Sequence, residues 1–459
     1  MRTKIHITTI ILISLFIFVN HSFAQRKGRQ INASININTA IDDSLKKSRL
    51  NLGFLTNIYR LEGIGINVIS SVVKNEMKGI QVSGLANVVG SKAKGTQISG
   101  LTNVNGKDFT GMSTSGIINI NGNKSNGLIL AGLANVTGEN SNGVAVGGLM
   151  NFTGKDMNGV QLSSIAGITG ENHNGANISG LLNIVARDLK GVQLTTLLNI
   201  CGDEAIGAQI SGIGNVGIDV KGMQFSALSN IAASEMTGFQ LSALTNISMK
   251  LKYGMQLSPA NITLEEMRGG QLGVGNYATE IRGVQIGLLN ICAGEVKGVQ
   301  IGLINHSKDT SAVKIGLVNV NPNTRIQLMA YGGNTSKANV AVRFKNRLFY
   351  SILGFGTHYL GLDEKFSGTF FYRAGVHHSF LKYFNISSDL GYYHVESFEN
   401  ESAIIPERMY SLQGRVNLEY HPIKKFGIFA SGGYGFTRYY NKNRTFEKKP
   451  IFELGIVLF

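Results

Sequence analysis

Residue types that could act in catalysis recur along the chain, but their arrangement argues against an active site. The motif Gly-x-Gln-x-Ser at 159–163 offers a serine nucleophile. A nucleophile elbow needs a helix directly after the serine, and no helical pattern follows this motif. Glycoside hydrolysis needs two clustered carboxylates, whereas acidic residues such as Glu139, Glu171 and Glu235 lie singly between repeats. We therefore expect no catalytic residues and no enzymatic activity.

No metal site and no cofactor site is expected either. Zinc sites need Cys or His ligands in closely spaced groups, and the adjacent His377 and His378 would point to opposite faces of a strand. Cys201 and Cys292 occupy equivalent places in different repeats. If the repeats stack, the two thiols lie several layers apart, which is too far for a disulfide.

The composition indicates a regular structure without a nucleic-acid partner. The chain has 58 Gly, 5 Pro and no Trp. Many glycines with few prolines are typical of an ordered structure with many tight turns. The formal net charge is +15. The Lys and Arg residues are scattered, with no dense basic run, so nucleic acid is not an expected partner.

The first residues resemble an export signal. Arg2 and Lys4 precede an apolar run over 7–19, and Ser22-Phe23-Ala24 supplies small residues for a peptidase. We predict a signal peptide at 1–24; a membrane anchor is the alternative. No later stretch has the ~20 apolar residues of a membrane helix, so any later crossing must use strands.

A repeat is the dominant feature of the sequence. The segments 78–87 and 94–103 share the pattern Lys-Gly-x-Gln-x-Ser-Gly-Leu-x-Asn. The final Asn recurs every 16 residues, with Gly167 in its place once, and later every 14–16 residues. The regular members of this series are Asn87, Asn103, Asn119, Asn135, Asn151, Asn183, Asn199 and Asn215.

Alternating apolar residues within each repeat predict short half-buried strands. Ile80 and Val82 alternate after Gly79, and a further apolar residue, Met77, precedes that glycine. We expect the residues at the Ile80 and Val82 positions to face inward. Because one repeat cannot bury its own apolar face but a stack can, we predict a parallel β-solenoid of ~16-residue repeats. It should occupy 63–321, after a linker and cap at 25–62. A large membrane barrel with one strand per repeat is the alternative; uniform linkers and few aromatic residues argue against it.

Two polar rows accompany the repeat. The Asn series is expected at one tight corner, where its amides would form a hydrogen-bonded ladder between layers. The Gln two residues after the leading Gly is expected to face outward. That row is either a ladder that solubilises the face or a binding stripe for a glycan or a protein. The candidate stripe consists of Gln193, Gln209, Gln224, Gln240 and Gln256.

The region 322–459 is predicted to be a separate small β-barrel. Repeats stop near Pro322 and aromatic residues become dense. Longer connections are expected after the odd strands and short ones after the even strands, which is typical of up-and-down outer-membrane barrels. Phe459 would act as the assembly signal of such a barrel. A soluble aromatic-rich sandwich is the alternative. The expected strands are 325–333, 339–346, 349–361, 368–381, 384–398, 409–423, 426–440 and 450–459.

The repeats at 283–290 and 298–305 look like those of surface-repeat proteins from Bacteroidetes and spirochaetes. The similarity covers roughly 50–320. It implies a location at the cell surface or envelope, and it supplies no catalytic residues.

The sequence thus predicts an all-β protein: a parallel solenoid followed by an antiparallel barrel of about eight strands. We expect a non-enzymatic protein of the bacterial outer membrane with a structural or adhesive role. Its expected partners are membrane lipid and a glycan, peptidoglycan or another protein. The alternative is a small pore or transport accessory. The even strand count and the short connection at 321–323 place the solenoid in the periplasm, whereas the resemblance suggests the surface.

Overall fold

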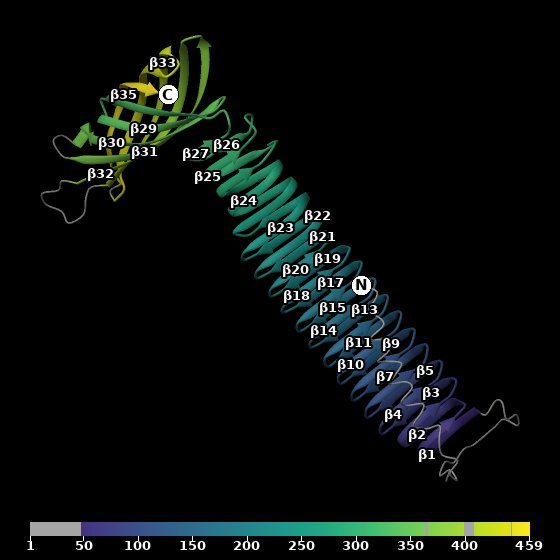
Figure 1. Cartoon of the computed structure of the whole chain (residues 1–459). Coiled ribbons are helices and arrows are strands. Elements are labelled where there is room, and N and C mark those ends of the chain that lie inside the picture. The colour runs from purple at the N-terminus through teal and green to yellow at the C-terminus, as the bar shows by residue number, and fades with distance from the viewer. Residues whose placement is uncertain (1–46, 363–365, 399–407, 442) are drawn as a thin grey trace. The chain divides into compact units, whose positions relative to one another are not determined.

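The structure is a computed structural model that describes residues 47–362, 366–398, 408–441 and 443–459 (Figure 1). The predicted signal peptide lies outside these residues. The fold is all-β, a parallel solenoid of about 17 turns followed by a closed eight-stranded antiparallel barrel, as predicted. Within the described residues, a 3-10 turn at Leu360–Leu362 interrupts the strands. No helix in the described part of the chain is long and apolar enough to span a membrane.

The chain divides into two compact units, one ending at Gly138 and the other covering Glu139–Phe459. Each is described by itself. The described residues of the first unit, 47–138, form solenoid coils, and the first strand among them begins at Lys47, inside the stretch assigned to a linker and cap. Its strands are β1 (Lys47–Ile58), β2 (Arg60–Val73), β3 (Met77–Ser83), β4 (Ala86–Val89), β5 (Ala93–Ser99), β6 (Thr102–Asn105), β7 (Phe109–Ser115), β8 (Ile118–Asn121), β9 (Ser125–Ala131) and β10 (Ala134–Thr137).

The second unit continues the coils and ends in the barrel. Its solenoid strands are β11 (Ser141–Gly147), β12 (Met150–Thr153), β13 (Met157–Ser163), β14 (Ala166–Thr169), β15 (His173–Ser179), β16 (Leu182–Val185), β17 (Leu189–Thr195), β18 (Leu198–Cys201), β19 (Glu204–Ser211), β20 (Gly214–Gly217), β21 (Asp219–Ser226), β22 (Ser229–Ser242), β23 (Thr245–Leu257), β24 (Ala260–Cys292), β25 (Val299–Ser307), β26 (Val313–Ile315) and β27 (Val318–Val320).

Each regular coil consists of a seven-residue strand, a corner, a four-residue strand and a turn. Parallel pairing places every residue on its equivalent 16 positions away; β13, for example, pairs with β15 so that Gln161 lies beside Asn177. The pairing between neighbouring repeats is parallel, so a membrane barrel made of repeats is excluded. The leading glycines from Gly63 to Gly269 have positive φ, and a Cβ at Gly191 would lie 2.0 Å from the Gly175 carbonyl oxygen. Only glycine therefore fits this position.

The predicted orientation of the long strand is wrong. In the coil that starts at Met77, the side chains of Met77 and Gln81 are fully buried, whereas Ile80 is 42% exposed. Strand residues two apart share a face, so the core position of Met77 places Gly79 and Gln81 on the inside. The apolar residues that flank Gln81 therefore face outward. The alternation in the sequence is compatible with either face of the strand pointing into the coil. The buried position of Met77 determines which face it is.

The Asn ladder is confirmed, but not at a corner. Asn183 lies within β16, is fully buried, and has no left-handed backbone. Its Nδ2 donates to the Asn199 Oδ1 at 3.1 Å and to the Asn177 carbonyl oxygen at 2.8 Å. The same amide contact joins Asn87 to Asn103, Asn103 to Asn119, Asn119 to Asn135 and Asn199 to Asn215. At the position where Gly167 replaces Asn, the Asn177 amide donates to the Gly167 carbonyl oxygen instead.

An apolar column fills the other half of many coils, whereas buried polar residues such as Asn121, Ser125 and Thr153 take its place in others. In the second unit Val185, Leu189, Cys201, Met236 and Leu251 are buried members of one cluster. In the first unit the equivalent cluster includes Leu61, Met77 and Phe109. The interior of a coil is therefore divided between an apolar column and the stacked Gln and Asn amides.

The barrel has the predicted eight strands. They are β28 (Arg325–Gly333), β29 (Ser336–Lys345), β30 (Phe349–Tyr359), β31 (Ser367–Leu381), β32 (Phe384–Ser397), β33 (Arg408–Ile423), β34 (Phe426–Tyr439) and β35 (Thr445–Leu458). Pairing of β28 with β35 closes the barrel. The connection from β28 to β29 was expected to be long but is only Asn334 and Thr335, because β29 begins earlier than predicted.

Candidate functional site

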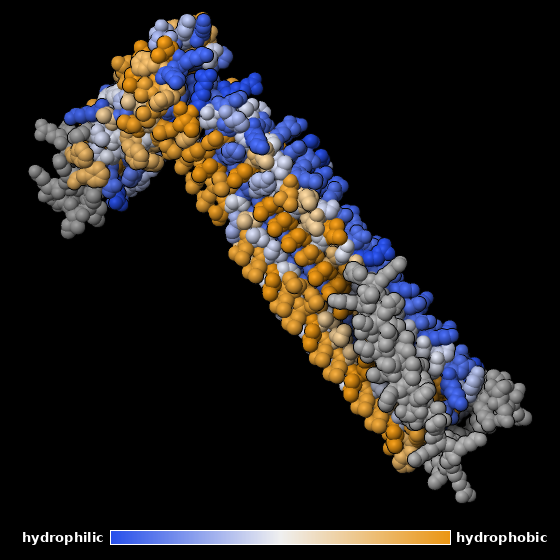
Figure 2. Space-filling model, viewed as in Figure 1, coloured by the Kyte–Doolittle hydropathy of each residue, from blue (hydrophilic) through white to orange (hydrophobic). Residues whose placement is uncertain are grey.

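Along the solenoid, the candidate site is an outward apolar face. Coils of the second unit contribute exposed residues from the first corner and, in most of them, also from the long strand. At the corner these are Leu149, Ile165, Leu181, Leu197, Ile213, Leu228 and Leu244, and on the long strand Val144, Val192, Leu194, Ile210, Met223, Leu241 and Met255, each between 36% and 53% exposed. Figure 2 shows apolar residues gathered on one side of these coils and polar residues on another.

The first unit carries the same face by itself. Ile80, Leu85, Ile98, Leu101, Met112, Ile117 and Leu133 are between 38% and 46% exposed. They occupy the long strand and first corner of their coils, as in the second unit.

Beneath this face the coil interior is polar. Gln240 Nε2 donates to the Gln224 Oε1 at 2.7 Å, and Gln256 Nε2 donates to the Gln240 Oε1 at 2.8 Å. Gln209 Nε2 likewise donates to the Gln193 Oε1 at 2.8 Å. All five residues of the predicted stripe are buried, so a Gln binding stripe on the outside is ruled out. Buried amides are tolerated because each finds a partner in the neighbouring coil.

Charged residues other than Lys314, which takes the buried Gln position in the last coil, lie in another part of the coil. They lie at the turn after the short strand and at the start of the long strand, and they pair between neighbouring coils. Lys155 Nζ lies 3.4 Å from the Glu139 carboxylate, and Lys252 Nζ lies 3.2 Å from that of Glu235. In the first unit Lys92 and Asp108 are 3.3 Å apart. We call this part the charged edge.

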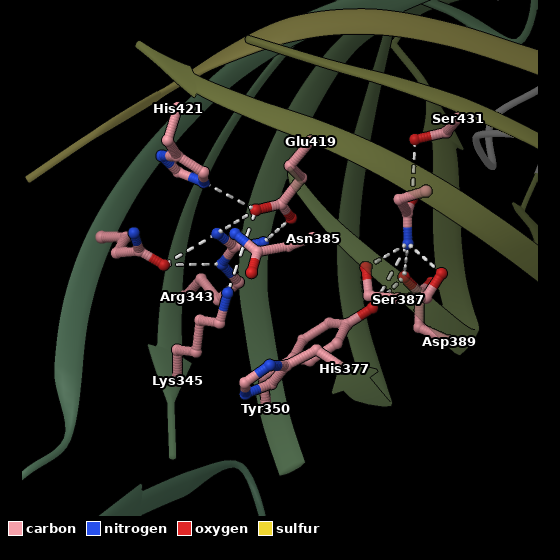
Figure 3. Close-up of polar contacts among 12 residues, drawn as sticks. Arg343, Lys345, Tyr350, His377, Asn385, Ser387, Asp389, Glu419, His421 and Ser431 are labelled. Atoms are coloured by element: carbon pink, nitrogen blue, oxygen red, sulfur yellow. Dashed lines mark hydrogen bonds and ion pairs between the residues drawn. The ribbon is translucent and has the colours of Figure 1, made fainter. Parts of the chain in front are cut away.

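Figure 3 shows the second candidate, the barrel lumen, where charged side chains from facing strands meet. Arg343 of β29 binds Glu419 of β33, with its Nη2 3.1 Å from the Oε2. The Tyr350 hydroxyl donates to the Asp389 Oδ2 at 2.8 Å, and the Asn417 amide donates to the same oxygen at 2.8 Å. These side chains point inward because strand positions alternate between lumen and exterior.

Two more ion pairs and several rings fill the rest of the lumen. Arg373 makes two hydrogen bonds to Asp389, at 2.8 and 2.7 Å, and Arg415 makes two to Glu453, at 3.0 and 2.8 Å. The rings of Phe371 and Tyr393 stack with centroids 4.8 Å apart. A further set of buried residues, including Met329, Tyr331, Ile352 and Phe429, packs around them. The lumen is therefore occupied by protein side chains.

The lumen opens into a polar cavity of about 1060 Å³ at the end where β28 begins and β35 ends. Its lining includes the basic residues Arg325, Lys345, Arg347, Lys382 and Lys424, together with His377 and His421. Two of these lining residues, Lys345 and His421, approach the buried carboxylate of Glu419 at 4.0 and 3.1 Å. The cavity thus has a cationic rim above a closed lumen.

The outer wall of the barrel is apolar. Phe355, Leu390, Val416, Phe452 and Leu454 occupy outward positions and are between 52% and 76% exposed. Their inward neighbours are buried, as in β32, where Asp389 is 3% exposed and Leu390 is 76% exposed. A water-soluble sandwich would place such residues in its core, so this wall contradicts the sandwich alternative.

The last coil packs against this wall within the second unit. The Ser351 hydroxyl donates to the Leu317 carbonyl oxygen at 2.8 Å, and the Tyr372 hydroxyl donates to that of Gly316 at 2.8 Å. Asn346 also donates to the Asn319 carbonyl oxygen at 3.1 Å. The exposed side chain of Ile315 therefore lies beside barrel-wall residues.

Other predicted residues have structural positions. Phe459 ends the chain 64% exposed, with its N–H bonded to the Lys425 carbonyl oxygen at 2.8 Å, and its role as an assembly signal stays a prediction. Cys201 and Cys292 are free and buried, and burial raises the pKa of the Cys201 thiol. Within the described ranges, no cluster of three His, Cys, Asp or Glu residues could hold a metal.

Sequence reasoning missed the apolar face. Its signal was present in the sequence as the Leu or Ile that follows each Ser-Gly or equivalent pair. A leucine at a corner of a water-soluble coil is unexpected, and its regular recurrence indicates a surface that something covers.

Comparison with known proteins adds little to this description. No family model matches the chain, and no curated protein matches it. Among solved structures, the N-terminal β-barrel domain of Pseudomonas aeruginosa OprF is similar over 29% of this chain and 93% of that chain, at 14% identity and a TM-score of 0.21.

Proposed function

We propose that the protein is a non-enzymatic component of the bacterial outer membrane, held there by the barrel formed by β28 to β35. The observation that carries the proposal is the inverted barrel: charged and paired side chains lie inside, and exposed apolar side chains lie outside. Lipid-spanning barrels show this alternation, because lipid replaces water as the outer solvent.

The strand lengths support a membrane position. Crossing the bilayer takes about 9–11 residues of tilted strand. The barrel strands span from 9 residues in β28 to 16 in β33. Closure leaves no unpaired edge, which a lipid environment requires.

The filled lumen favours an anchor over a pore. In an eight-stranded barrel the interior is just wide enough for side chains, and here Arg343, Arg373 and Arg415 with their carboxylate partners occupy it. Reconstitution into planar bilayers should therefore give no steady conductance. Ohmic single-channel currents would overturn the anchor proposal in favour of the pore.

Membrane anchoring is tested by removing the closing strand. A chain that ends before Ile451 loses most of the pairing of β35 with β28 and β34. We expect it to be exported but absent from the outer-membrane fraction. A matched control lacks only Asn441 and Asn443 of the connection before β35 and should assemble normally. Normal recovery of the truncated chain in the outer membrane would contradict the proposal.

The barrel connections support a periplasmic solenoid. The start of β28 and the finish of β35 lie on the side of the barrel that carries the connections 346–348, 382–383 and 424–425. The opposite side carries the longer connections 360–366 and 398–407. Long connections of such barrels face the outside. An epitope inserted between Lys155 and Asp156 should therefore be labelled only after permeabilisation, whereas one at Asn443 should be labelled in intact cells. Labelling of the first epitope in intact cells would place the solenoid on the surface.

A further inference from the structure

The outward apolar face is uncharged along a long series of coils. In the coil that starts at Met77 it consists of five outward positions: Ile80, Val82, Leu85, Ala86 and Val88. In the first unit, the residues through Val136 that stack on these five hold no Asp, Glu, Lys or Arg. The equivalent positions of the second unit from Val144 through Leu257 hold none either. All the charges of these coils lie elsewhere, mainly at the charged edge.

The face is larger than a soluble monomer exposes. The five positions span about 25 Å of strand at ~3.3 Å per residue, and coils repeat every ~4.8 Å. Each coil therefore contributes on the order of 100 Å², and the eight coils from Ser141 to the start of Met267 on the order of 900 Å². Soluble monomers rarely expose apolar patches above roughly 300–600 Å².

The interior beneath the face identifies the kind of solvent it meets. A solenoid in water places apolar residues inside and polar residues outside. In this half of the coil the order is reversed: Leu194 and Leu181 are about 40% exposed, while Gln193 and Asn183 are fully buried. Polar inside and apolar outside is the pattern of protein walls that face lipid. At the charged edge the usual order returns, with Leu189 buried and Lys190 exposed.

The face also continues onto the barrel wall. The last coil is fixed to outward residues of the barrel by the Ser351 and Tyr372 hydrogen bonds to its backbone. Ile315, 56% exposed, lies there beside Phe349 and Val376, which are 44% and 49% exposed. A soluble partner that covered this end of the face would have to share its surface with lipid around the barrel.

We propose that the outward apolar face of the solenoid is immersed in the acyl-chain layer of the membrane that holds the barrel, with the charged edge in water. The solenoid is then a monotopic membrane element, not a rod that projects into an aqueous compartment. This inference rests on the proposed membrane position of the barrel. Embedding on one side only is the β counterpart of an interfacial amphipathic helix.

Tryptophan reporters can test this directly, because the chain contains no Trp. The full-length protein is reconstituted into phosphatidylcholine vesicles with and without acyl-chain-brominated lipid, which quenches nearby indole fluorescence. Leu181→Trp places the reporter on the apolar face, and Arg187→Trp places it on the exposed charged edge of the same coil. Leu390→Trp reports on the barrel wall.

We expect Leu181→Trp to show blue-shifted emission and to lose most of it in brominated vesicles, as Leu390→Trp does. Arg187→Trp should keep water-like emission and remain unquenched. If Leu390→Trp is quenched and Leu181→Trp is not, the barrel proposal stands and the inference fails. If the emission of Leu181→Trp is blue-shifted but not quenched, a second copy or another protein covers the face. That result would also overturn the inference. An unquenched Leu390→Trp would overturn the membrane proposal itself.

Discussion

A buried histidine should make one part of the solenoid sensitive to acid. His173 occupies the apolar column position that Met157 and Leu189 hold in the neighbouring coils, and it is fully buried. Its Nδ1 lies 3.1 Å from the Thr169 hydroxyl. Burial lowers the pKa of His173 from 6.5 to about 4, since an apolar surrounding disfavours the imidazolium.

The direction and size of the effect follow from linkage. Between pH 6.5 and 4 the unfolded chain binds a proton that the folded chain does not, so stability is present above pH 6.5 and is lost on acidification. One pKa unit corresponds to about 1.4 kcal/mol. Relative to pH 7, the loss is therefore about 2 kcal/mol at pH 5 and about 3 kcal/mol at pH 4.

The assay is hydrogen–deuterium exchange of peptides from 157–201 in the reconstituted full chain, comparing wild type with His173→Leu at each pH. Leu matches the neighbouring column residue and removes the titration. For openings that expose His173, we compare the exchange rate of wild type with that of His173→Leu. This ratio of wild type to variant should be about 100-fold larger at pH 4 than at pH 7. Met157→Leu, one coil away, is the control and should show no pH-dependent difference. An equal ratio of wild type to His173→Leu at pH 4 and pH 7 would refute the lowered pKa.

Three further substitutions test the coil, each by urea unfolding of the reconstituted protein. Asn183→Leu should cost about 1–3 kcal/mol, since three hydrogen bonds from its amide are lost; no change would mean that the ladder does not stabilise the fold. Gln240→Leu should cost a similar amount, about 1–3 kcal/mol, because Gln224 Oε1 loses its donor and Gln256 Nε2 loses one of its acceptors, whereas an outward Gln would show a change of about 0.5 kcal/mol or less. Gly191→Ala should cost about 3 kcal/mol or more, because of its positive φ and the contact with Gly175, and a neutral result would contradict the close stacking.

Part of this structure could be predicted because it depends on spacing alone. The 16-residue recurrence of Asn and Gly determines that equivalent residues stack in parallel, so the solenoid and the Asn ladder followed directly. The eight barrel strands were predictable because apolar alternation and polar connections mark each strand in its own sequence. Their ends were less certain, as β29 shows, because a strand end depends on its pairing partner.

Which residues of the long strand face the inside of the coil was decided by the tertiary structure. Alternation shows that Ile80 and Val82 share one face of a strand and that Gln81 lies on the other, but it does not say which face is enclosed. In water, burying Ile80 and exposing Gln81 is favoured, and the sequence was interpreted on that basis. In the stacked coils this preference is reversed, because the buried amide of Gln81 has a hydrogen-bond partner in Gln97 of the next coil. Such a partner lies 16 residues away and exists only once the coils are stacked, so only the tertiary structure shows that the Gln row lies inside and that its apolar neighbours on the strand face outward.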